Sequence, residues 1–331
     1  VFAAEWLRHQ RRDAYWTHGS VSEDYSRITA PTLIVGGWLD GYAPVVFSLL
    51  ENLTAPRKAL LGPWGHKFPH QGVPGPAIDF LSEAKRWLDR WLKDIPTGVE
   101  TDPDLRVYLM DGARPLPHFD RREGRWLGIP HWPDAPVERQ TFAVWVDRLA
   151  KGKPGETGEE RLLRSPLTTG MRGQEWCPYG QGRIAAEGAV DQREDDAGSL
   201  CFDTDPLDVP LEILGTAHLH LRLATDRPQA MVAARLCDVA PDGTSALVTF
   251  GLLNLSHRHG SEAPAPMQPG EAESVVLTFK PAGQVIPVGH RLRLAISSSY
   301  WPMAWPAPEM AMLTVDAGSV ELDLPVLATR D

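Results

Sequence analysis

Two polar residues in the first part of the chain could work together as an acid–base pair. Asp40 stands in GGWLDGY (36–42) and His66 in GPWGH (62–66), and each motif follows a short apolar run typical of a buried strand. In open α/β sheets, reactive groups gather in the loops beyond the carboxyl ends of the strands, so we expect both side chains at the same edge. An Asp that accepts a hydrogen bond from one imidazole nitrogen fixes the tautomer and leaves the other nitrogen free as a general base.

Each residue also has an ordinary structural explanation. A Gly-flanked Asp in a loop after a strand is commonly a turn former or a helix cap, and a single loop His has no required role. Their order, context and spacing together make the catalytic pair an alternative equal to these structural explanations. No serine in a suitable elbow accompanies them, because Ser245 lacks a following Gly and stands in a β-rich region, while Ser20 precedes a polar connector. If a triad exists, we expect its serine to precede Val1.

The elements that must position the pair alternate between strands and helices. The runs TLIVGG (32–37) and KALLG (58–62) predict two strands covered on both faces. Pro44 is suited to begin a helix, and residues 79–94 have the strongest helical periodicity of the chain, with Pro96 after them. This alternation is the pattern of an open parallel sheet with helices on its faces, of which only the last third is present.

The pattern changes from Asp104 onward to short alternating segments separated by Gly, Pro and Asp turns. In HLHLRLA (218–224), the leucines fall on one face while His220 and Arg222 fall on the other, which is the period of a half-buried strand. Many such strands indicate a β-sandwich or jelly roll. We place the boundary between the α/β part and the β-rich part within residues 94–104.

The composition is that of an ordinary globular protein. The 331 residues include 43% hydrophobic and 23% charged residues, with a net charge of −10, which argues against nucleic acid or an anionic membrane as a partner. No apolar run approaches the roughly 18 residues of a membrane span. Cys177, Cys201 and Cys237 stand in no metal-binding or CxxC spacing, so we expect reduced thiols, no metal, no cofactor and a cytoplasmic protein.

The beginning of the chain predicts a single helix over residues 1–19. Phe2, Trp6 and Leu7 follow helical spacing from the outset, and Gly19 is a suitable end. Because this pattern starts without an initiating Met, we expect a processed or fragmentary piece of a longer protein.

Five segments in order resemble one known family. They are WLRHQRRDAYWTHGSVSEDYSRI (6–28), PTLIVGGWLDGY (31–42), LLGPWGH (60–66), LCDVAPDGTSALVTFGLLNLSHR (236–258) and GHRLRLAISSSYWPMAWP (289–306). They are similar to the serine hydrolases of the cocaine esterase, X-Pro dipeptidyl-peptidase and α-amino acid ester hydrolase family, and the resemblance covers essentially the whole chain. It implies three parts, which are the end of a helical cap over 1–27, the C-terminal part of an α/β-hydrolase domain over 28–98, and a jelly-roll β-sandwich domain over 99–331.

The resemblance also implies roles for individual residues. Asp40 and His66 match the catalytic Asp and His of the family, which cleaves acyl esters, α-amino acid esters or X-Pro peptides through an acyl-enzyme. Tyr42 is similar in position to an aromatic residue of the acyl pocket, with packing against the cap as the alternative. Trp176 and Tyr179 belong to a loop that faces the active site in relatives, so we expect them to contact substrate.

The half that would carry the nucleophile and the oxyanion-hole donors is not matched by any residue of this chain. We therefore expect the chain alone to be inactive, and an N-terminal segment or a complementary chain to supply the serine. The partners implied are a small ester or short peptide substrate and that complementary segment, and a homo-oligomer is possible.

A second class of function is a non-catalytic binding module, in which a jelly roll with a residual hydrolase framework binds carbohydrate or protein. Trp301 and Trp305 could form a carbohydrate-stacking platform, although core packing explains large aromatic residues better. His257 and His259 suggest a metal site only weakly, because no carboxylate pair is near them in the sequence, and a solvated loop is the better explanation.

Overall fold

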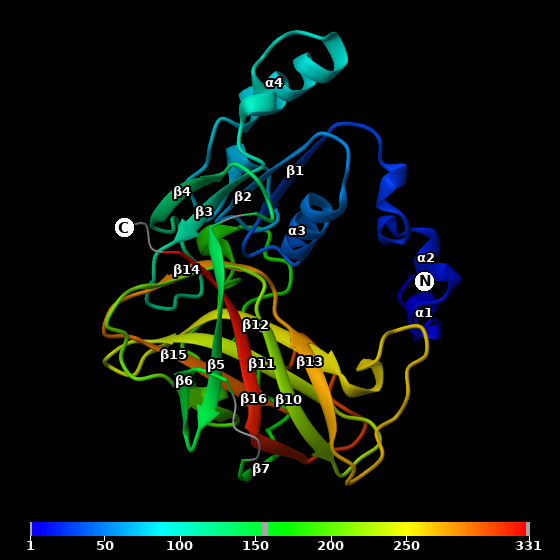
Figure 1. Cartoon of the computed structure of the whole chain (residues 1–331), viewed down its shortest axis with the longest axis vertical. Coiled ribbons are helices and arrows are strands. Elements are labelled where there is room, and N and C mark those ends of the chain that lie inside the picture. Colours follow the sequence, from blue (N-terminus) through cyan, green and yellow to red (C-terminus); the bar gives the residue numbers. More distant parts are fainter. Residues whose placement is uncertain (1, 135, 154–157, 329–331) are drawn as a thin grey trace.

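A curled β-sheet is the main structural feature of the chain (Figure 1). The structure, a computed structural model, describes residues 2–134, 136–153 and 158–328. Within these ranges, hydrogen bonds join sixteen strands into one continuous sheet. The helices α1 to α4 all precede residue 94, and one short helix, α5 (Arg193–Asp196), follows later. The prediction of a β-rich C-terminal part is therefore confirmed, while its jelly-roll topology stays a prediction. No helix of the described ranges combines the length and the apolar composition that a membrane crossing requires.

The N-terminal segment forms two short helices, α1 (Phe2–Arg8) and α2 (Ala14–His18), so the prediction of one helix over 1–19 is wrong. The reason is Asp13, whose side chain accepts hydrogen bonds from the amide of Tyr15 and from Nδ1 of His9. At Asp13, the side-chain hydrogen bond that caps a new helix competes with the backbone hydrogen bonds that would continue the previous one. Hydrophobic spacing carries no information about this competition. Neither helix buries a residue within the described chain.

The two strands predicted around the chemical motifs are confirmed. Strands β1 (Thr32–Gly37) and β2 (Arg57–Gly62) pair in parallel, with Gly37 opposite Gly62 at their carboxyl ends. Helix α3 (Ala43–Asn52) begins with Pro44 in its first turn and lies beside the two strands (Figure 1). Helix α4 (Phe80–Lys93) is capped by the side chain of Asp79 and extends away from the sheet.

Strand β3 (Leu105–Met110) continues the parallel sheet beyond residue 98, where we expected the α/β part to end. It pairs in parallel with β2 and antiparallel with β4 (Gly124–Ile129). One further bridge joins Met110 of β3 to Gln284 of β14 (Ala282–Ile286). Five of the six residues of β3 are buried, so this strand is part of the core next to β2 although it follows the expected boundary in the sequence.

The β-rich part consists mainly of antiparallel pairs around a core in which Leu, Val, Ile and Phe side chains are prominent. In β10, Leu219, Leu221 and Leu223 are buried while His220 and Arg222 are exposed, so the alternation predicted for this segment is confirmed. The remaining strands are β5 (Val137–Trp145), β6 (Arg148–Lys151), β7 (Glu160–Leu163), β8 (Leu200–Asp203), β9 (Leu211–Gly215), β10 (His218–Thr225), β11 (Met231–Val239), β12 (Ser245–Asn254), β13 (Glu273–Thr278), β15 (Arg291–Ser297) and β16 (Leu313–Leu327).

Candidate active site

The loops that follow β1 and β2 are joined backbone to backbone. The amide of Trp38 donates to the carbonyl of Gly62 at 2.9 Å, and the amide of Leu39 donates to the carbonyl of Trp64 at 3.1 Å. Gly37 permits this approach, because a Cβ at that position would lie 2.1 Å from the carbonyl oxygen of Trp64. Each loop therefore has a fixed position relative to the other before any side chain is considered.

This arrangement brings Asp40 and His66 into direct contact. Nδ1 of His66 lies 2.8 Å from Oδ2 of Asp40, and the carboxylate also accepts a hydrogen bond from the amide of Tyr42 through Oδ1. The Asp40 side chain is only 10% exposed, whereas that of His66 is 46% exposed. A buried carboxylate on Nδ1 fixes the tautomer in which Nε2 carries the lone pair, so the outer side of this imidazole can accept a proton.

Two aromatic side chains lie beside the exposed imidazole, and a third packs against one of them. The rings of Tyr42 and Tyr179 lie 5.7 Å and 5.5 Å from the His66 ring, and the ring of Trp176 packs edge-on against Tyr42 at 5.1 Å. All three are about half exposed. The structure thus assembles around His66 the three residues that we expected to contact substrate, although they come from two distant segments, and their role stays a prediction.

Two residues that sequence patterns did not reveal reach Asp40 from the β-rich part. Sγ of Cys177 lies 3.7 Å from Oδ1 of Asp40, and Nζ of Lys280 donates to the main-chain oxygen of Asp40 at 3.1 Å. They are separated from Asp40 by 137 and 240 residues. No local motif marks either one; the only available signal was that Cys177 stands between the aromatic residues already expected at the site.

The cluster of Asp40, His66 and Cys177 has the donor atoms of a possible metal site, since one ligand atom of each lies within 4.8 Å of the others. The donor chemistry fits hydrogen bonding better. Burial and the neighbouring carboxylate of Asp40 raise the pKa of the Cys177 thiol, which favours its protonated form. The protonated thiol instead donates to Asp40.

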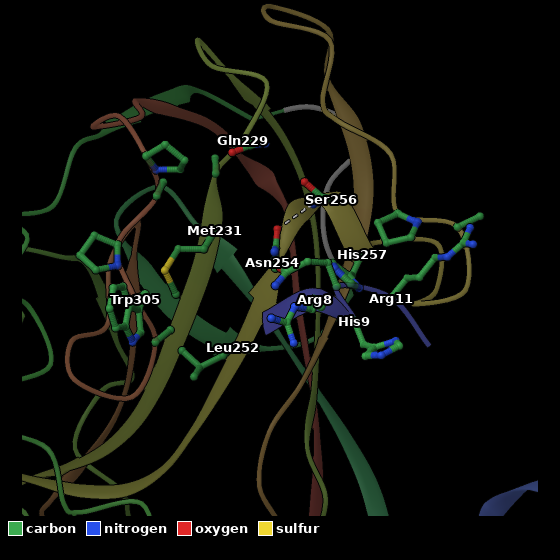
Figure 2. Close-up of a pocket in the computed structure, with 18 of the residues that line it drawn as sticks. Arg8, His9, Arg11, Gln229, Met231, Leu252, Asn254, Ser256, His257 and Trp305 are labelled. Atoms are coloured by element: carbon green, nitrogen blue, oxygen red, sulfur yellow. Dashed lines mark hydrogen bonds between the residues drawn. The ribbon is translucent and has the colours of Figure 1, made fainter. Parts of the chain in front are cut away.

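A cavity of about 1250 Å³ lies away from this cluster, between the N-terminal segment and the β-rich part. Figure 2 shows Trp305 and Met231 on one side of it and Arg8, His9 and Arg11 on the other. Neither Asp40 nor His66 lines it. Trp305 is 86% exposed, so its predicted core packing is wrong: it belongs to the loop between β15 and β16, which runs over the surface rather than into the core.

Comparisons with family models match residues 1–68 to the X-Pro dipeptidyl-peptidase (S15 family) and residues 97–329 to the X-Pro dipeptidyl-peptidase C-terminal non-catalytic domain. The chain belongs to the X-Pro dipeptidyl-peptidase family, whose members are serine hydrolases and which also includes cocaine esterase.

Individual relatives are distant in sequence. A putative serine esterase of Mycobacterium bovis is 26% identical over 325 residues, with 88% of this chain and 49% of the relative covered. Cocaine esterase of a Rhodococcus species is 23% identical, with 89% and 53% covered. The crystal structure of an aminopeptidase from a marine sediment archaeon superposes with a TM-score of 0.78 at 18% identity, covering 99% of this chain and 60% of that one, and supports the fold. The chain spans about half the length of the curated relatives it matches.

Proposed function

We propose that this chain is the Asp–His half of a serine hydrolase of the α/β-hydrolase type, which cleaves an ester or amide through an acyl-enzyme. The observation that carries the proposal is the 2.8 Å contact between His66 Nδ1 and Asp40 Oδ2, with the other side of the imidazole open. A buried Asp, a half-exposed His and a nucleophile beyond its Nε2 form the arrangement that serine hydrolases use on several folds.

The reaction assigns one task to each residue. His66 Nε2 takes the proton from the serine hydroxyl as its oxygen attacks the substrate carbonyl, and it then returns that proton to the leaving alcohol or amine. In the second half, the same nitrogen takes a proton from water, which attacks the acyl-enzyme. Asp40 stays ionised throughout and stabilises the imidazolium that forms in both halves.

The serine and the oxyanion-hole donors are contributed by a segment outside residues 1–331 or by a second chain. The relatives that match this chain extend over about twice its length, which leaves room for such a segment in the whole protein. On this proposal the chain by itself turns over no substrate, and activity requires the assembly that contains the nucleophile.

The residues present favour an apolar ester over a substrate with a free amino group. The wall beside His66 consists of Tyr42, Trp176 and Tyr179, which offer ring faces and edges to an acyl or alkoxy group. In the described part of the chain, Asp40 is the one carboxylate paired with His66, and nearby Glu187 already accepts hydrogen bonds from two main-chain amides. Recognition of an α-amino group, as in an amino acid ester or an X-Pro peptide, would therefore depend on the other half.

The test uses the protein that contains the nucleophile, treated with a fluorophosphonate probe and assayed with a p-nitrophenyl ester. We expect one labelled serine and turnover that His66→Ala abolishes. His131→Ala is the matched control, because His131 is exposed and lies outside this cluster. Unchanged turnover in His66→Ala, or no labelled serine in any chain of the active preparation, would refute the proposal and leave a binding module as the better description.

A further inference from the structure

Three side chains form hydrogen bonds with Asp40, and two of them belong to the β-rich part of the chain. We propose that Cys177 and Lys280 are positioning residues for Asp40: they occupy its Oδ1 and its main-chain oxygen, so that Oδ2 remains directed at His66. The inference rests on the proposed function, in which Asp40 orients the catalytic imidazole. It assigns a part in the reaction to the portion of the chain that matches a domain described as non-catalytic.

Cys177 fixes the rotation of the Asp40 carboxylate. Its Sγ lies 3.7 Å from Oδ1, the same oxygen that accepts from the amide of Tyr42. With both donors on Oδ1, the carboxylate presents Oδ2 to His66 and cannot turn without losing two hydrogen bonds. Burial, followed by the charge of Asp40, raises the pKa of Cys177, so the group remains a thiol with a proton to donate at neutral pH.

Lys280 adds a side-chain hydrogen bond to the backbone that carries this carboxylate, at a main-chain oxygen that also accepts from the amide of Ala43. Its Nζ donates to the Asp40 carbonyl at 3.1 Å and lies 5.6 Å from the centre of the Phe250 ring. The main chain of Lys280 is itself held, because its amide donates to Phe250 and its carbonyl accepts from Thr249 Oγ1. The middle of β12 thus holds the main chain from which the ammonium extends.

The ammonium of Lys280 forms no ion pair with a carboxylate among the described residues. Buried ammonium groups are normally paired with a carboxylate, yet no ion pair within 4.0 Å is found for Lys280 among the described residues. Burial lowers its pKa to about 8, and the negative charge of Asp40 opposes that shift. The other ionisable groups at this point are Cys177 and, across a small cavity, Arg122. Lys280 therefore places a positive charge beside the main chain of Asp40.

The segment around Cys177 also holds the loop of His66. Gln174 Nε2 donates to the carbonyl of Leu39, beside Asp40, and the carbonyl of Pro178 accepts from the amide of His66. Trp176 covers Gly41 so closely that a Cβ there would lie 2.6 Å from the indole. One short segment of the β-rich part thus touches both loops, and a shift of this segment would change the distance between them.

The experiment compares four variants and one control variant in the protein that contains the nucleophile. Cys177→Ala and Lys280→Met remove the donors, whereas Cys177→Ser and Lys280→Arg keep a donor in place. Cys201→Ala is the control, since Cys201 is a thiol of β8 that donates to the carbonyl of Asp196 and not to Asp40. We expect kcat for a p-nitrophenyl ester to fall about tenfold in the first two, with KM unchanged, and to remain near that of the wild type in the other three.

A second readout separates positioning from simple stability. The Nδ1 proton of His66, followed by NMR in the chain itself, should lose its strongly downfield resonance in Cys177→Ala and Lys280→Met and keep it in Cys201→Ala. The inference is overturned if both donor-deleting variants keep the wild-type kcat and this resonance. If His66→Ala remains active, the proposed function fails instead, and the resonance still reports whether Cys177 and Lys280 position Asp40.

Discussion

Replacing Gly37 with Ala tests the backbone arrangement on which the Asp40–His66 contact depends. The added Cβ would lie 2.1 Å from the carbonyl oxygen of Trp64, 2.7 Å from its carbonyl carbon and 2.9 Å from the carbonyl oxygen of Gly65. All three are main-chain atoms and cannot rotate away, so the two loops must separate by roughly 1 Å to restore ordinary contact distances. The 2.8 Å hydrogen bond between His66 and Asp40 spans those same loops and would be stretched beyond useful length.

We expect Gly37→Ala to lower kcat by about 10²-fold in the protein that contains the nucleophile, the loss that a 1 Å misplacement typically causes. Overpacking should also lower the free energy of unfolding by roughly 1–3 kcal/mol, measured by urea denaturation of the chain. Gly19→Ala is the control, because a Cβ at that position meets nothing within 4 Å. If Gly37→Ala matches Gly19→Ala in both measurements, the backbone contact between the loops is not as the structure describes it.

Three further outcomes follow from the same structure. Asp40→Asn should lower kcat by roughly 10⁴-fold without unfolding the chain, since the amide favours the wrong tautomer of His66; a loss below tenfold would contradict the orienting role. Burial lowers the pKa of Lys280 to about 8, so above that pH the folded chain releases a proton that the unfolded chain keeps. The free energy of unfolding should therefore increase as pH rises above 8, by at most about 1.4 kcal/mol per pH unit. Urea titrations across that range should show this contribution in the wild type and not in Lys280→Met. Trp64→Ala should lower the free energy of unfolding by about 3–5 kcal/mol, because the indole is fully buried and donates to a main-chain carbonyl. Trp305→Ala should change it by less than about 0.5 kcal/mol, because this side chain is exposed. Equal losses in the two variants would mean that the burial of these residues is misassigned.

The proximity of Asp40 and His66 could be predicted because it depends on local patterns. Two apolar runs predict neighbouring parallel strands, and parallel strands place the residues that follow them at one edge. The helix break at Asp13 could not be predicted from hydrophobic spacing, since a capping side chain competes with helix continuation there. The partners Cys177 and Lys280 lie beyond prediction for another reason: their contacts with Asp40 depend on how the β-rich part packs against the parallel strands, which no local periodicity encodes.

The sequence separations around Asp40 have a consequence for synthesis. The side chains that form hydrogen bonds with it stand 26, 137 and 240 residues further along the chain, at His66, Cys177 and Lys280. A ribosome therefore releases the last of them only when most of the β-rich part has been made, and contacts between such distant segments form late in folding because closing long loops costs entropy. A partly synthesised chain can bring Asp40 to His66 without holding it there. The full geometry of this carboxylate is thus acquired only by molecules whose C-terminal strands have already folded.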